Sequence, residues 1–209
     1  MNAFLGPLDS SGGVPPLQQT RVAAFLISAH GALARRLAIG TPATLKFGWQ
    51  TELHSQLYRE TEIATLMMRA TSWVADFELA PLCLSWETAW LPKAVEGVAD
   101  WSQGLLIDLA ALAHAIHAAI RPAALLPVEA NAQDPFVLAL RRIEFESSRL
   151  IQAQILFLKG PEFVPIRGCV NRAVERRHQQ VRDLWEAMLK TIGVQCAQQI
   201  PSSQQIQKP

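Results

Sequence analysis

The sequence has few of the features that define secreted, disulfide-rich or nucleophilic proteins. Its three cysteines lie far apart and form neither a disulfide framework nor a zinc-binding pattern, which is typical of a reducing compartment. The first sixteen residues contain no basic cluster followed by an apolar stretch, so they do not match a secretory signal. The sequence also contains no Gly-x-Ser-x-Gly motif and no glycine-rich phosphate loop. We therefore expect a cytoplasmic protein and predict no catalytic residue.

The sequence also has no excess of charge of either sign. The 19 basic and 18 acidic residues give a formal net charge of +1. A balanced chain has no general electrostatic attraction for nucleic acid or membranes, so only a local patch could provide one. Apolar residues, in contrast, make up 50% of the 209 residues. That content is enough to bury one sizeable core.

One apolar stretch, residues 104–120, has a length at the short end for a membrane-spanning helix. It contains Asp108, His114 and His117. Ionisable side chains cost about 2.5–3.5 kcal/mol each at the centre of a bilayer. We therefore predict a buried central helix of a soluble bundle and no membrane partner.

Apolar residues recur at helical spacing in several long stretches, and no stretch shows the alternation of a β-strand. The predicted long helices cover residues 21–39, 51–79, 105–120, 134–158 and 169–192, and a shorter tryptophan-rich region covers 85–103. Each helix has one apolar face that it cannot bury alone. The predicted fold class is all-α: a single antiparallel helical-bundle-like domain of five to six helices.

Composition divides the chain into three parts. Residues 1–19 contain several glycines and prolines and are predicted to be a flexible leader. Residues 20–193 form the helical domain, in which the proline-containing segment 121–134 is the candidate hinge. Residues 194–209 are rich in glutamine and serine and are predicted to be a disordered tail.

Arginine is concentrated in the second half of the chain. Four arginines on the last predicted helix form a candidate surface for phosphates or an acidic partner: Arg172, Arg176, Arg177 and Arg182. We expect them to lie off the apolar stripe and to face solvent. Acidic residues are interleaved, and Arg142 with Glu146 and Arg182 with Glu186 have the four-residue spacing of helical ion pairs. A salt-bridged solvated face is therefore the other interpretation.

Three tryptophans lie in a short region that prolines interrupt. Trp86 and Trp90 lie between Pro81 and Pro92, and Trp101 follows Pro92. Because of the two prolines, this region cannot form one long helix. Part of its apolar surface is then expected to remain uncovered, and such patches mark interfaces. We predict a homodimer or a protein partner that contacts these tryptophans.

A helical bundle can also house a di-iron centre. Such a centre takes a Glu from each of two helices and a Glu-x-x-His motif from each of two others. The chain has one such motif, Glu175 to His178. Carboxylates on other helices are Glu60, Glu62, Glu87, Glu144 and Glu146. The motif lies among arginines and glutamines rather than on an apolar stripe, so we expect it to face water.

Other ionisable residues are weaker candidates still. His114 and His117, three residues apart, could present two metal ligands on one helix face. Glu60, Glu62 and Arg69 are predicted to lie on a solvated face of the helix 51–79. We predict no cofactor and no metal, which favours a non-enzymatic interaction protein, with a helical-bundle metalloenzyme as the alternative.

The order of these features resembles the AcaB-like proteins of plasmids and integrating conjugative elements. The similarity lies in an early Arg/Ala-rich helix, with Arg21-Val-Ala-Ala-Phe and Gly31-Ala-Leu-Ala-Arg-Arg, and in a later helix from Asp134-Pro-Phe-Val-Leu to Leu158. The basic DNA-reading strand of the regulator members is not visible in this sequence. The resemblance implies a cytoplasmic accessory or regulatory protein of a mobile genetic element, and nucleic acid is a candidate partner.

Overall fold

The computed structural model describes residues 16–40, 47–74, 76–91, 95–126 and 130–194. Within these residues it contains six α-helices and no strand, which confirms the predicted all-α fold. The helices are α1 (Pro16–Gly40), α2 (Phe47–Ala70), α3 (Asp76–Glu87), α4 (Trp101–Ala119), α5 (Pro135–Leu158) and α6 (Arg167–Thr191). Short 3₁₀ turns connect some of them, at Thr88–Trp90, Pro122–Leu125 and Pro161–Ile166. Most of the predicted leader and tail, and Pro92, lie outside the described residues.

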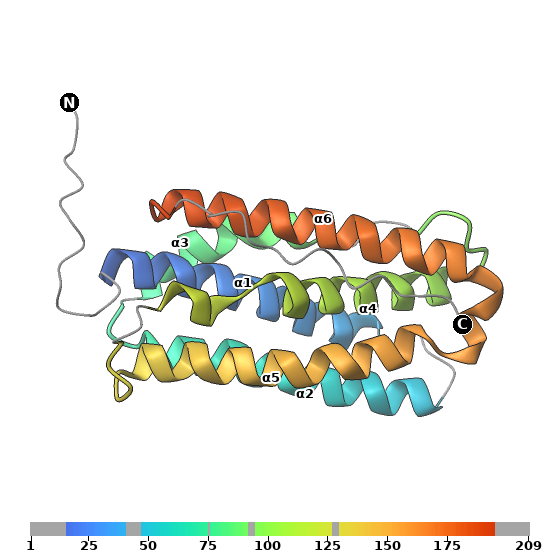
Figure 1. Ribbon diagram of the computed structural model, residues 1–209, viewed down its shortest axis with the longest axis horizontal. Coiled ribbons are helices and arrows are strands. Elements are labelled where there is room, and N and C mark those ends of the chain that lie inside the picture. The colour runs from blue at the N-terminus through green and yellow to red at the C-terminus, as the bar shows by residue number, and fades with distance from the viewer. Residues whose placement is uncertain (1–15, 41–46, 75, 92–94, 127–129, 195–209) are drawn as a thin grey trace.

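The helices lie roughly side by side along the long axis of the molecule (Figure 1). Helices α1 and α4 run through the middle, with α2 and α5 on one side and α3 and α6 on the other. In agreement with this view, α1 packs against α2 and α3, and α4 packs against α5 and α6. The two central helices therefore contact neighbours on several sides, so they need an apolar surface on more than one face.

The sequences of α1 and α4 meet this need with alanine and leucine. Every residue from Leu106 to Ala113 is buried, as is every residue from Val22 to Leu26. By length and composition, the segments Leu17–Gly40 and Trp101–Leu125 could each cross a membrane. However, 67% and 72% of their apolar windows are buried inside the bundle, and core helices of soluble proteins meet the same criterion.

Several helix ends lie where the sequence predicts them. Asp134 caps α5 by accepting a hydrogen bond from the backbone N–H of Phe136, and Pro135 occupies the first helical position. Gly193 follows α6 with a φ of 76°, a left-handed conformation that glycine adopts without strain. Helix α4, in contrast, begins at Trp101 and not at the predicted residue 105, because Asp100 caps it by accepting from the N–H groups of Ser102 and Gln103.

The single predicted helix 51–79 is wrong, because the chain breaks there into α2 and α3. The hydroxyl of Thr71 donates to the carbonyl oxygen of Met67 at 2.8 Å, and a tight turn follows, with the Val74 N–H bonded to the Thr71 carbonyl. Pro81, expected to end the helix, instead lies inside α3. The tight turn at residues 71–74 thus ends α2 well before the proline.

A buried ion pair joins α6 to α4. The guanidinium of Arg177 is fully buried and donates through Nε and Nη2 to the two carboxylate oxygens of Asp108, the first at 3.0 Å. Its Nη1 also donates to the Leu91 carbonyl and to Gln180 Oε1. The expectation that Arg177 faces solvent is therefore wrong. The α4 carboxylate draws this side chain inward, and the forked geometry of the guanidinium satisfies it there.

Loss of this pair should destabilise the fold strongly. Arg177→Ala leaves the Asp108 carboxylate buried without its partner, so we expect a loss of about 3–5 kcal/mol in the free energy of unfolding, measured by urea denaturation. Replacing both partners with apolar residues, as in Asp108→Leu/Arg177→Met, should cost less than the single change. The control Arg172→Ala, at an exposed position of the same helix, should cost under about 1 kcal/mol. Equal losses for the two alanine variants would contradict the assignment.

Candidate functional site

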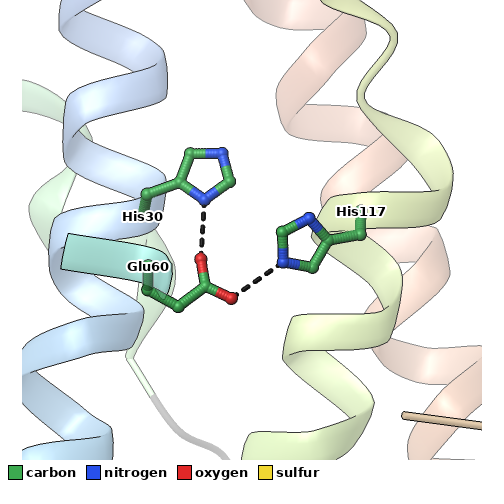
Figure 2. Close-up of side chains that lie close together, drawn as sticks. All are labelled: His30, Glu60 and His117. Atoms are coloured by element: carbon green, nitrogen blue, oxygen red, sulfur yellow. Dashed lines mark hydrogen bonds and ion pairs between the residues drawn. The ribbon is translucent and has the colours of Figure 1, made fainter. Parts of the chain in front are cut away.

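A fully buried carboxylate lies at the centre of the bundle between two imidazoles (Figure 2). Glu60 Oε2 is 2.7 Å from His30 Nδ1, and Glu60 Oε1 is 2.8 Å from His117 Nε2. The other ring nitrogen of His117, Nδ1, is 2.9 Å from Ser147 Oγ. The four side chains come from α1, α2, α4 and α5 and are all buried. We call them the core cluster.

The helical register brings these polar residues into the core. On α2, Glu60 continues a stripe of buried residues that recur three and four positions apart: Leu53, Gln56, Ile63 and Met67. His30 falls in the same way between Leu26 and Leu33 on α1. The prediction that Glu60 faces solvent is wrong, because its position in this stripe sets its orientation, although its chemistry favours water.

Hydrogen bonding keeps Glu60 ionised despite its burial. Burial alone raises the pKa of its carboxyl group, but the charge and hydrogen bond of His117 and the contact with His30 outweigh burial and lower the pKa to about 2. Burial lowers the pKa of His30, which Glu60 only partly offsets. A carboxylate only accepts hydrogen bonds, so the two facing nitrogens, His30 Nδ1 and His117 Nε2, carry the protons.

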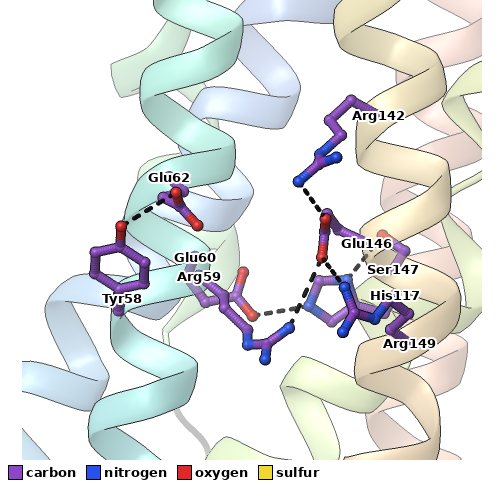
Figure 3. Close-up of polar contacts among 9 residues, drawn as sticks. All are labelled: Tyr58, Arg59, Glu60, Glu62, His117, Arg142, Glu146, Ser147 and Arg149. Atoms are coloured by element: carbon purple, nitrogen blue, oxygen red, sulfur yellow. Dashed lines mark hydrogen bonds and ion pairs between the residues drawn. The ribbon is translucent and has the colours of Figure 1, made fainter.

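A second polar group lies outside the core cluster, on the face formed by α2 and α5 (Figure 3). Glu146 forms an ion pair with Arg142 at 2.7 Å, as the four-residue spacing predicts. Arg59 of α2 and Arg149 of α5 approach the same carboxylate at 3.8 Å each. Three guanidinium groups thus approach one carboxylate.

An exposed aromatic ring lies between two of these cations. Phe145 is 57% exposed, and the guanidinium carbons of Arg142 and Arg149 each lie 5.9 Å from its ring centroid. This distance is within the range of a cation–π contact. The phenyl ring therefore presents an open surface flanked by positive charge.

A recess of about 190 Å³ opens between α2 and α5. Its lining residues are Glu52, Ser55, Gln56, Arg59, Arg149, Leu150 and Ala153. Gln56 is buried, and its amide nitrogen has no hydrogen-bond partner among the described residues. The recess therefore contains two guanidinium groups, the carboxylate of Glu52 and an amide donor without a partner among the described residues. We call the recess together with Phe145 and Arg142 the α2–α5 face.

The predicted di-iron ligands do not come together in the part of the chain that the structure describes. Glu144 pairs with Arg121 at 3.0 Å, and Glu175 is exposed, as expected. His178, expected to face water, is instead half-buried, with its Nε2 2.7 Å from His114 Nδ1. Helix α6 packs against α4, which brings the two imidazoles together.

The four α6 arginines differ in exposure. Arg172 is exposed and donates to Cys169 Sγ, whereas Arg176 is half-buried. Arg182 is also half-buried and donates to Gln179 Oε1 at 3.0 Å. Because Arg177 is buried against Asp108, the predicted phosphate-binding set loses one of its members.

The three tryptophans also differ in exposure. Trp90 is fully buried and donates through Nε1 to Ser28 Oγ at 2.7 Å, so its predicted place in an interface is wrong. Trp86 packs edge-on against Phe25. Trp101, at the start of α4, is 72% exposed and is the member of this set that offers a large apolar surface to a partner. Hydrogen bonding to a serine of α1 explains the inward position of Trp90.

Comparisons of this chain with protein-family models, with curated proteins and with solved structures give no match.

The His114–His178 pair should make stability depend on pH. Burial lowers the pKa of His178 to about 4, with smaller contributions from His114 and Arg182, while the ordinary value is 6.5. Protons therefore bind the unfolded chain more readily, so this stability is complete above pH 6.5 and is lost as the pH falls towards 4.

We expect His178→Gln to make the decrease in melting temperature between pH 6.5 and 4 shallower than in the wild type. The measurement is thermal unfolding at a series of pH values. His54→Gln, at an exposed histidine, should leave the profile unchanged. Parallel curves for wild type and His178→Gln would show that the imidazole pair does not carry this pH dependence.

Proposed function

We propose that the protein is a non-enzymatic accessory protein that binds single-stranded nucleic acid through the α2–α5 face. The observation that carries the proposal is the position of exposed Phe145 between Arg142 and Arg149, with Arg149 also lining the recess that contains Arg59. Aromatic stacking on bases combined with arginine contacts to phosphates is the usual way in which proteins bind single strands.

The chemistry of the recess suits a phosphate group. Arg59 and Arg149 supply charged, forked donors, and Gln56 supplies a neutral amide donor that has no partner among the described residues. A phosphate needs several donors at once, because each of its oxygens accepts hydrogen bonds. A base attached to that phosphate could then stack on Phe145.

Glu146 does not prevent this binding mode. Its close ion pair is with Arg142, at 2.7 Å, whereas Arg59 and Arg149 lie 3.8 Å away, beyond ordinary hydrogen-bond length. The two longer contacts can exchange for a phosphate while the Glu146 side chain, which is 14% exposed, keeps its close partner Arg142. Glu146 thus keeps the three guanidinium groups close together in the absence of a ligand.

The resemblance to AcaB-like proteins supports a cytoplasmic accessory or regulatory role in a mobile genetic element. A homodimer or protein partner at exposed Trp101 is part of the same proposal, because a large exposed aromatic side chain often marks an interface. Trp101 belongs to α4, whereas the α2–α5 face is formed by residues of α2 and α5.

Fluorescence anisotropy of a labelled thymidine oligonucleotide of about 20 nucleotides tests the proposal. Wild-type binding should weaken as salt rises from about 50 to 200 mM, because each phosphate contact releases counterions. Arg59→Ala/Arg149→Ala should reduce the log–log salt slope by about 1.4, since each contact on a single strand contributes about 0.7. Phe145→Ala should weaken binding by about 1–3 kcal/mol through lost stacking.

The matched control is Arg172→Ala/Arg176→Ala, which removes two arginines from α6. We expect this variant to retain the wild-type slope. Absence of binding at about 50 mM salt would refute the proposal. A slope that falls with the α6 pair and not with Arg59 and Arg149 would move the contact to the surface that the sequence predicts.

A further inference from the structure

We infer that His30, Glu60 and His117 form a binding site for one divalent transition-metal ion, with zinc as the best match to the ligand set. The inference does not depend on nucleic-acid binding, because it concerns the core cluster alone. It differs from the di-iron site that the sequence suggests, since it uses Glu60 and His30 in place of the Glu175–His178 motif.

The ligand atoms have the required chemistry and spacing. Each residue offers one ligand atom, and all three atoms lie within 4.8 Å of one another. Two ligands of a tetrahedral zinc ion lie roughly 3.3 Å apart, given metal–ligand bonds of about 2.0–2.2 Å. His30 Nδ1 and His117 Nε2 contact different oxygens of Glu60, at 2.7 and 2.8 Å, and the 4.8 Å limit on all separations leaves room for the zinc value. Small side-chain movements therefore suffice to enclose an ion.

Two imidazoles and one carboxylate form a common ligand set for zinc and for iron(II). To bind an ion, each imidazole moves its proton to its other ring nitrogen, so that His30 Nδ1 and His117 Nε2 present lone pairs. For His117 the receiving nitrogen already faces Ser147 Oγ at 2.9 Å. Such a hydrogen bond on the far side of the ring fixes the orientation of metal-bound histidines.

Burial and charge support the same assignment. The three side chains are almost completely shielded from solvent, and the carboxylate is the acidic member of the cluster. The two imidazoles satisfy the buried carboxylate in the metal-free protein, and a divalent cation would take over this role as its positive partner. The recess lies nearby, because Gln56, which lines it, is one helical turn before Glu60 on the same face of α2. An ion bound here would tie α1, α2 and α4 together.

The experiment uses the full chain, treated with a chelator, dialysed and then titrated with zinc chloride alone. We expect one zinc ion per chain by elemental analysis. We also expect the melting temperature to rise by about 5–10 °C when free zinc is 100-fold above its dissociation constant. Cobalt(II) in place of zinc should give the visible absorption of a four-coordinate site. If the protein retains no ion and its melting temperature does not change, the core cluster is a hydrogen-bonded network only.

Two variants locate the ion. His117→Gln should lose it, whereas His114→Gln, one turn earlier on α4, should bind zinc as the wild type does. Glu60→Gln keeps the shape of the side chain, and its amide can accept from one imidazole and donate to the other, so it should fold and bind no zinc. Circular dichroism confirms folding of each variant. A folded Glu60→Gln protein with wild-type zinc content, or loss of zinc in His114→Gln alone, would overturn the assignment.

Discussion

The structure depends on one electrostatic constraint: a carboxylate buried at the centre of a helical bundle must have partners that replace water. Glu60 meets this constraint with two imidazoles, one from α1 and one from α4. Because the donors must reach the carboxylate at hydrogen-bond length, the rotation and height of three helices are fixed together. Ser147 extends the restraint to α5 through His117. Apolar packing tolerates small shifts of register, but a buried charge tolerates very few.

The Arg177–Asp108 pair imposes a similar restraint on the other side of the bundle. It holds α6 against α4 and reaches the Leu91 carbonyl beyond the 3₁₀ turn that follows α3. The central helix α4 takes part in both groups, through Asp108 and His117. Alanines surround these residues on α4, so neighbouring helices approach closely enough for short polar contacts. The remaining guanidinium groups of α2 and α5 are left at the surface, where they can meet an anionic partner.

The fold could be predicted from the sequence, but most of the candidate site could not. Apolar periodicity predicts the long helices, and Asp134 and Gly193 predict two of their ends, because these signals are local. Glu60 and Arg177 were both assigned to solvent, because a charged residue faces water unless a partner on another helix draws it in. The partners, His30 with His117 and Asp108, are far away in the sequence, so only packing reveals them. The spacing of Leu53, Glu60 and Met67 was the one local signal for a buried carboxylate.

The most direct test of this account is the protonation of the two imidazoles around Glu60. Long-range ¹⁵N–¹H NMR spectra of the metal-free protein at neutral pH report which ring nitrogen of each histidine carries a proton. The account predicts a protonated Nδ1 on His30 and a protonated Nε2 on His117, both in slow exchange with water. Rapidly exchanging imidazoles, with the tautomer mixture of solvent-exposed histidines such as His54, would contradict the central position of the Glu60 carboxylate.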